Sequence, residues 1–242
     1  MPTLAFYIDA PLQSWGASSK FQHRETNGFP TKSAIVGLIA GALGIDKYGA
    51  TEVIDLQPIA DLKLTVVRIN KGQQMSSRFT DFHTVGGGYN KKATLWEKMS
   101  IPKKASGAPF GTVITRRSYL TDANFVALLE GDEDILTQIH TALLDPAWGI
   151  WFGRKTCLPA SPLSPHVGDS RQAALDRLLS FLPGHTITPL KRFEYQEEIE
   201  AATDVDGTFH QSDKPVAFGQ HHGAVPAAYR ARSIRQHRPK NQ

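Results

Sequence analysis

The chain has 242 residues, and its 40% hydrophobic content is enough for one large domain or two small domains with packed cores. Its formal net charge is +4 and its pI is about 9.1, and no apolar run approaches the roughly 20 residues that span a bilayer. These properties argue against a membrane protein and predict a cytoplasmic one, while the single cysteine, Cys157, excludes a disulfide framework or a cysteine-based zinc cluster.

The N-terminal residues predict a strand followed by a long loop. β-Branched and aromatic residues alternate loosely in TLAFYIDA, residues 3–10, and the strand is expected to end at Pro11. Residues 11–30 show no convincing periodicity, and loops of this length in compact domains are usually functional or disordered. The loop contains aromatic and basic side chains that could contact a ligand: Trp15, Lys20, Phe21, His23 and Arg24, with Gly16 beside them.

An apolar stripe with helical spacing predicts a helix over residues 32–43 that ends near Gly44 and packs on a sheet. The helix starts with FPTKS, which places a cation where the helix dipole favours an anion. With Thr31 as N-cap, the free amides of Lys32, Ser33 and Ala34 could hold a phosphate, which Lys32 would reinforce. The alternative is an ordinary capped helix with an exposed lysine in its first turn.

The rest of the chain predicts an α+β fold. Residues 60–70 resemble a strand, residues 71–111 are polar, basic and rich in glycine, and two strands at 112–120 and 124–131 precede a helix at 132–146. This order predicts a ferredoxin-like, RNA-recognition-type domain over residues 1–160, interrupted at 71–111 by a projecting arm, either a hairpin or a partly ordered segment. A proline-rich linker, a helix at 169–183 and strands at 190–200 and 226–237 predict a smaller C-terminal unit over residues 161–242.

The mixture of cations and aromatic residues indicates an RNA-binding protein. Single-stranded RNA is held by cations on its phosphates and by planar side chains that stack on its bases. Arg116 and Arg117 are adjacent on a predicted strand and should face opposite sides, so one serves the structure and the other meets the partner. Gly153 could bring backbone close to a phosphate. Further candidates outside the first loop are Arg78, His83, Lys91, Lys92, Lys103, Lys104, Arg154 and Lys155.

The basic C-terminal residues 229–242, YRARSIRQHRPKNQ, carry five cations and no acid. This asymmetry is typical of a segment that meets a polyanion, although a solvated terminus would have the same composition.

Several ordered blocks of the sequence together resemble the CRISPR-associated CasD family. The blocks are DAPLQSWG, RET, FPTKSAIVGLIAGALGI, RFTDFHTV, ITRRSYLTDANFVALL and WGIWFGRKTCLPASPL, and they span roughly residues 4–165. Members of this family are the 5′-handle-binding subunits of type I-E Cascade, within the repeat-associated mysterious protein superfamily. The C-terminal third matches only in general character, and GGGYNKK in the arm departs from the family pattern.

The resemblance implies a ferredoxin-like domain with a thumb-like arm that binds the 5′ handle of a CRISPR RNA. The expected neighbours are the backbone subunit and the large subunit of the complex. Target DNA is contacted only through the complex, because the guide and the large subunit read it. Carried over, the Trp15 loop, the Lys32 helix start and Arg116/Arg117 lie near the handle, residues 71–111 form the thumb, and no cofactor or metal is expected.

Two enzymatic alternatives remain open in the sequence. A metal-independent endoribonuclease that matures the precursor RNA could use His83 with Tyr89 and Lys91 or Lys92, but the adjacent GGG opposes the rigid geometry that acid-base cleavage needs. A metal-dependent hydrolase could use Asp81 and His83, or His221 and His222, but no third ligand is identifiable. The first choice is therefore a non-catalytic RNA-binding subunit.

Overall fold

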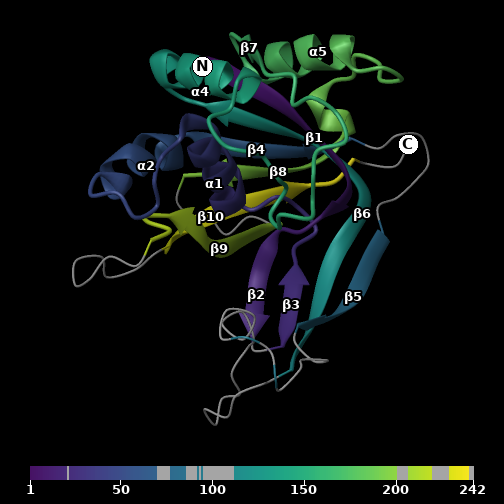
Figure 1. The fold of residues 1–242 in the computed structure, drawn as a ribbon. Helices are drawn as coiled ribbons and strands as arrows, with labels where there is room; N and C mark the ends of the chain where they lie inside the picture. Colours follow the sequence, from purple (N-terminus) through teal and green to yellow (C-terminus); the bar gives the residue numbers. More distant parts are fainter. Residues whose placement is uncertain are drawn as a thin grey trace.

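The computed structural model describes residues 1–20, 22–69, 77–85, 92, 94, 112–200, 207–219 and 229–239. It combines helices with one large, mainly antiparallel sheet, so the predicted α+β class is confirmed (Figure 1). The strands are β1 (Thr3–Gln13), β2 (Gly16–Lys20), β3 (His23–Thr26), β4 (Lys63–Arg68), β5 (Ser77–Val85), β6 (Val113–Glu130), β7 (His166–Gly168), β8 (Glu194–Ile199), β9 (Thr208–Pro215) and β10 (Tyr229–His237). The helices are α1 (Lys32–Leu43), α2 (Glu52–Asp61), α4 (Glu133–Leu144), α5 (Arg171–Phe181) and the short 3-10 helix η1 (Leu190–Arg192).

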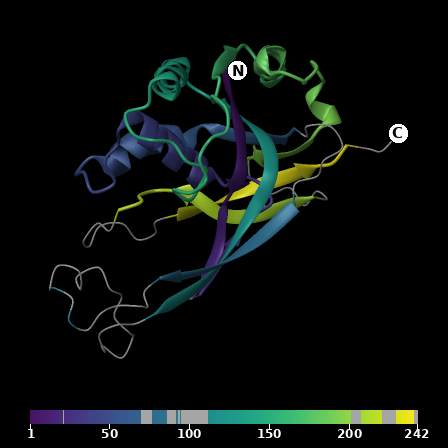
Figure 2. The same cartoon turned by 45° about the vertical axis from the view of Figure 1, so that its right-hand side comes forward.

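Strand β6 is the centre of the sheet. Its C-terminal half pairs antiparallel with β1 and with β4, and its N-terminal half pairs antiparallel with β5 and parallel with β3. From β4 the sheet continues through β8 and β10 to β9, and β1 also pairs with β7. The part that carries β2, β3 and β5 therefore extends away from the helices, at the lower end of the molecule in Figure 1 and Figure 2.

The expectation of two strands at 112–120 and 124–131 was wrong, because β6 runs through both. The expected end of the first strand at Pro11 was also wrong, since β1 continues to Gln13. Ala10 pairs with Ala123 and Leu12 with Thr121, and the register partners skip Pro11 and Asp122 between them. Proline has no N–H to donate, and Asp122 has a positive φ of 51°, so both strands pass this point as a local irregularity.

Several other helices and strands were not predicted from the sequence. Part of the expected loop at 11–30 forms the β2–β3 hairpin, whose exposed residues on β3 explain why no apolar alternation marked it. Helix α2 and strand β9 were not anticipated. Within the expected arm at 71–111, β5 pairs with the start of β6 as in a hairpin, and most of the remaining arm lies outside the described residues.

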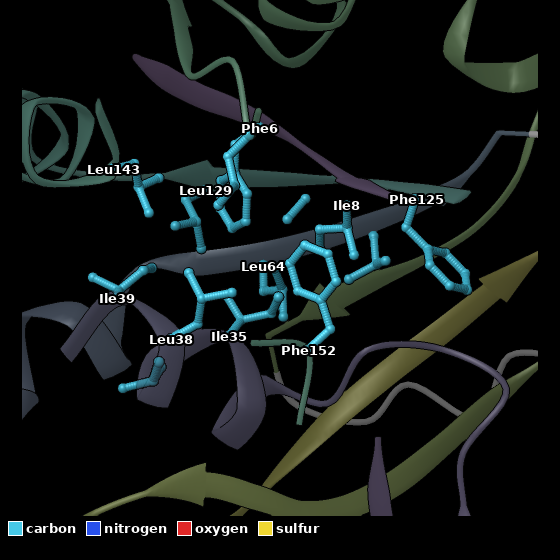
Figure 3. Packing of buried hydrophobic residues seen from close by; sticks show 14 of the residues in the cluster. Phe6, Ile8, Ile35, Leu38, Ile39, Leu64, Phe125, Leu129, Leu143 and Phe152 are labelled. Atoms are coloured by element: carbon cyan, nitrogen blue, oxygen red, sulfur yellow. The ribbon is translucent and has the colours of Figure 1, made fainter. Parts of the chain in front are cut away.

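Helices cover both faces of the sheet. Phe6 and Ile8 of β1 pack with α1, α2 and α4 in one core cluster, whereas Ala5 and Tyr7 pack with α5 in the other. Figure 3 shows the first cluster, where Ile35, Leu38 and Ile39 of α1 approach Leu64, Leu129 and Phe152. Successive strand residues point to opposite faces, and both faces are covered here. The residues of β1 that face either side are therefore apolar and buried.

Helix α1 begins and ends as its sequence predicts. Thr31 is the N-cap and its side chain accepts a hydrogen bond from the amide of Ala34, and Gly44 closes the helix in the left-handed conformation with φ 75°. In the described part of the chain, no helix is long and apolar enough to cross a membrane.

The division near residue 160 stays a prediction. Strand β8 pairs with β4 over four residue pairs, so the C-terminal strands extend the sheet that the N-terminal residues begin. Helix α5 likewise packs on the face formed by β1 and β6.

We expect Leu178→Ala in α5 to lower the free energy of unfolding by about 2–5 kcal/mol, because the side chain is fully buried in the second cluster. Urea unfolding followed by circular dichroism measures the change. The control is Leu144→Ala at the end of α4, whose leucine is 63% exposed and which should change stability by at most about 0.5 kcal/mol. Equal losses in both variants would contradict the packing of α5 on the sheet.

Candidate nucleic-acid interface

One row of side chains crosses β3, β6 and β5 on a single face. His23 is in register with Arg116, and Arg116 is in register with Phe82. The Arg116 guanidinium carbon lies 6.0 Å from the centroid of the Phe82 ring, and that phenylalanine is 59% exposed. His23 and Arg116 are exposed as well. This basic row, His23, Arg116 and Phe82, combines a cation with two planar groups, which is the chemistry that holds single-stranded RNA.

The opposite face carries the neighbouring row, Arg24, Arg117 and Asp81. These residues are also in register across β3, β6 and β5. Arg117 is half-buried, and its Nε donates to Thr115 Oγ1 at 3.1 Å. Because Asp81 is the register partner of Arg117, an acid accompanies this arginine on its own face. Of the adjacent pair, Arg116 is therefore the more exposed residue.

Arg154 fastens β3 to β6 instead of projecting into solvent. Its Nη1 donates to the carbonyl of Ser118 at 3.0 Å and its Nη2 to the carbonyl of Arg24 at 2.9 Å. The guanidinium carbon also lies 4.5 Å from the centroid of the Tyr119 ring. Two of the Arg154 donors therefore serve backbone carbonyls of the fold, while a contact of Arg154 with RNA stays a prediction.

Gly153 and Trp15 also serve the structure. Gly153 has φ 95°, and a Cβ there would meet the carbonyl oxygen of Ser14 at 1.7 Å. The close approach allows the amide of Ser14 to donate to the carbonyl of Phe152 at 3.0 Å. Trp15 is fully buried, with its ring 6.0 Å from that of Phe152. The glycine thus admits protein backbone and not a phosphate, and Trp15 is a core residue and not a stacking platform.

The largest correction concerns Lys32. Its side chain is 1% exposed, and its Nζ bonds to Glu198 Oε2 at 2.6 Å and to the carbonyl of Leu62 at 2.9 Å. Its amide donates to Asp213 Oδ2 at 2.8 Å, so a carboxylate of the chain itself occupies the start of α1. Burial lowers the pKa of Lys32 below its ordinary value, although the Glu198 carboxylate opposes this change. The lysine therefore stabilises the fold, and the expected phosphate site at this helix start is wrong.

A groove of about 500 Å³ opens over the outer face of α1, and Arg24 of the neighbouring row lines it. Small residues of α1, among them Ala34, Gly37 and Gly41, lie along it. Its walls contain aromatic and charged residues, namely Trp148, Trp151, Phe218, Tyr229, Arg24, Glu25, Lys47 and Arg154. A second hollow shares Gly16, Ser33 and Tyr229 with this α1 groove and continues along β9 past His210.

The remaining expected residues have different positions. Gly16 and Ser33 line the α1 groove, and Thr31 lines it while capping the helix. Lys155 is exposed, with its Nζ 5.5 Å from the centroid of the Trp151 ring. On β5, Arg78 is exposed and His83 is half-buried. The side chain of Lys20 lies outside the described residues, as do Phe21, Lys91, Lys103 and Lys104.

Sequence reasoning missed Phe82, Lys47, Trp148 and Trp151 as candidate contacts. A signal was present in WGIWFGRK, residues 148–155, where two cations closely follow two tryptophans in a loop. Phe82 gave no such signal, because only the strand register shows that it shares a face with Arg116.

The catalytic alternatives gain no geometric support from the described residues. Asp81 and His83 lie on β5, but in the part of the chain that is described no group of three His, Cys, Asp or Glu side chains could hold a metal ion. Tyr89, Lys91, His221 and His222 lie outside the described residues.

We expect Lys32→Met to lower the free energy of unfolding by about 3 kcal/mol, because it leaves the Glu198 carboxylate without its main partner. The double variant Lys32→Met/Glu198→Leu should recover most of that loss, and Lys155→Met is the control at an exposed lysine. Thermal and urea unfolding measure all three. A single variant as stable as the wild type would show that the buried pair contributes nothing.

Comparison with known proteins places this fold in a family. The model described as "CRISPR-associated protein (Cas_Cas5)" matches residues 3–225. The CRISPR system Cascade subunit CasD of Escherichia coli (strain K12) is 26% identical over 168 residues, which are 66% of this chain and 68% of that protein.

Two solved structures are similar over nearly the whole chain. A chain of a CRISPR RNA-guided surveillance complex has a TM-score of 0.69 and 27% identity, covering 97% of this chain and 88% of that chain. A crystal structure of a Cas protein has a TM-score of 0.57 and 25% identity, covering 97% of this chain and 93% of that chain. Since the family model spans most of the sequence, the chain belongs to the Cas5 family of CRISPR-associated proteins.

Proposed function

We propose that this chain is a non-catalytic RNA-binding subunit of a CRISPR surveillance complex, where it holds the 5′ handle of the CRISPR RNA and serves antiviral defence. The family supports the assignment to CRISPR defence. The similar E. coli protein is a Cascade subunit, and the similar solved chain comes from an RNA-guided surveillance complex.

We further propose that the core is ferredoxin-like. Its strands lie in the order β4-β6-β1-β7, with α1 between β1 and β4 in the sequence and α4 between β6 and β7. This is the split β-α-β arrangement of a βαββαβ domain. RNA-recognition domains of that kind bind single strands on sheet residues that carry aromatic side chains.

The observation that carries the proposal is the basic row. Arg116 lies over the exposed ring of Phe82, and His23 is on its other side. A phosphate on Arg116 and a base stacked on Phe82 would use both groups at once, because a nucleotide presents a negative charge next to a planar ring. The row therefore fits a single strand better than a duplex, whose bases are stacked on one another.

The α1 groove is the second part of the proposed interface. Arg24 of β3 lines it, so the groove lies on the opposite face of β3 from His23 and a strand that reached both would pass around the edge of β3. Lys47 lies in its wall, and Lys155 lies over Trp151, another wall residue. These cations can hold phosphates along the rim, while the apolar floor and tryptophan walls can receive an unstacked base.

The expected partners are the CRISPR RNA, the backbone subunit and the large subunit, with target DNA reached only through the complex. The arm at 71–111 is proposed to contact the backbone subunit. Its described strand β5 exposes Phe79 by 48% and Phe82 by 59%. Exposed aromatic residues of this size are typical of surfaces that meet another molecule.

The proposed function is non-catalytic, because RNA cleavage needs an acid and a base held around one phosphate. His83 has Asp81 two residues away on β5, and its other suggested partners flank the GGG segment. Repeat RNA incubated with the protein in EDTA should therefore remain intact.

We expect Arg116→Gln to weaken binding of a repeat-derived 5′-handle RNA and to lower the slope of log K against log salt by about 1, because one phosphate contact is lost. Phe82→Ala should cost about 1–3 kcal/mol of binding free energy with little change in that slope, because it removes stacking and not charge. Fluorescence anisotropy at several salt concentrations measures both effects.

Arg192→Gln is the matched control, since Arg192 is an exposed arginine of η1 outside the basic row. If this control lowers the salt slope as much as Arg116→Gln does, the basic row is not the RNA site.

We expect Gly41→Leu to lower handle affinity at least tenfold without loss of stability. A Cβ at Gly41 meets nothing within 4 Å, so a leucine fills the α1 groove while the helix gains a better helix former. Gly41→Ala is the control, because it brings the same gain in helix propensity, about 1 kcal/mol, but leaves most of the groove open. Wild-type affinity in the leucine variant, with unfolding unchanged, would remove the groove from the interface.

A further inference from the structure

A second cavity lies at the end of the molecule opposite β2, β3 and β5, between α4, α5 and β7 (Figure 1 and Figure 2). Its volume is about 430 Å³, within the usual range for small-ligand sites. Six residues line it: Thr137, His140, His166, Val167, Arg177 and Phe181.

The cavity gathers one arginine and two histidines, and no carboxylate is among the described residues that line it. His140 comes from α4, His166 from β7 and Arg177 from α5. Arg177 Nη1 donates to the carbonyl of Val167 at 3.1 Å, which fixes the guanidinium at the edge of β7. Burial lowers the pKa of His166, and the nearby charges of Arg177 and His140 lower it further. An anion in the cavity would relieve this repulsion.

An aromatic pair, with one exposed ring, adjoins Arg177 and His140 in this cavity. The rings of His166 and Phe181 stack with their centroids 4.6 Å apart and an angle of 21° between their planes. Phe181 is 65% exposed, so a large part of its ring has no protein neighbour. Fixed next to a guanidinium, this ring can stack on a second planar group.

We propose that this cavity binds one nucleotide unit of a single-stranded nucleic acid, with the phosphate on Arg177 and His140 and the base on Phe181. The site is separate from the basic row and does not depend on the function of that row. An acidic peptide would use the cations but not the exposed ring. The Arg177 side chain is bonded to the Val167 carbonyl and so lies across the edge of β7, where it obstructs strand addition by a peptide.

The test is a titration of the full chain, with its histidines isotopically labelled, by the tetranucleotides U4 and dT4. We expect the imidazole signals of His140 and His166 to shift with either probe. The probe that binds more tightly identifies the natural ligand as RNA or DNA. Phe181→Ala and Arg177→Gln should each weaken this response at least fivefold, the equivalent of about 1 kcal/mol. Phe181→Ala should fold normally, because its ring is mostly exposed.

Two controls separate this site from the proposed handle interface. Arg116→Gln should leave the shifts of His140 and His166 unchanged, and Arg192→Gln tests the loss of an exposed arginine in general. The proposal is overturned if neither tetranucleotide shifts these signals. It is also overturned if inorganic phosphate binds as tightly as the tetranucleotides and its affinity is unchanged by Phe181→Ala. Tighter binding of a tetra-aspartate peptide than of both nucleotide probes would overturn it as well.

Discussion

The pairing of β6 with strands on both of its sides is the constraint on which the rest of the structure depends. Over its 18 residues, the C-terminal half lies in the core between β1 and β4, and the N-terminal half holds β3 and β5. The side chains of Phe125 and Arg116 thus belong to one strand, although one is buried and the other is exposed. Burial of the C-terminal half positions the exposed row, because a paired strand cannot shift register without turning its apolar residues outward.

At the start of α1, carboxylates of the chain itself take the place of the external anion that the local sequence suggested. A lysine at this position is unfavourable for the helix dipole, and that suggested an external phosphate. Instead Asp213 accepts the first amide, Glu198 pairs with the lysine, and Arg232 donates two hydrogen bonds to Asp213. The partners come from β8, β9 and β10, more than 160 residues away, so this ion network fastens the C-terminal strands to the first helix.

The sequence predicts helices whose apolar residues recur with helical spacing. It does not predict strands whose position depends on pairing with residues far away in the chain. The stripe and caps of α1, the amphipathic α4 and the helix α5 follow from spacing alone. The β2–β3 hairpin does not, because His23 and Arg24 are exposed on a strand that pairs with β6. For the candidate interface, Arg116 was identified from its charge, whereas Phe82 required the register, and the burial of Trp15 and Lys32 required their tertiary neighbours.

The bonds of Arg154 have a consequence for genetic screens of this chain. A substitution there would release the backbone carbonyls of Ser118 and Arg24 and loosen the joint between β6 and β3, where His23 and Arg116 lie. If the proposed function holds, such a variant would lower RNA affinity through the fold, because Arg154 holds the two strands that carry His23 and Arg116. A screen for lost RNA binding would then return Arg154 together with the residues of the proposed interface, and only a stability measurement on each isolated variant would separate the two kinds.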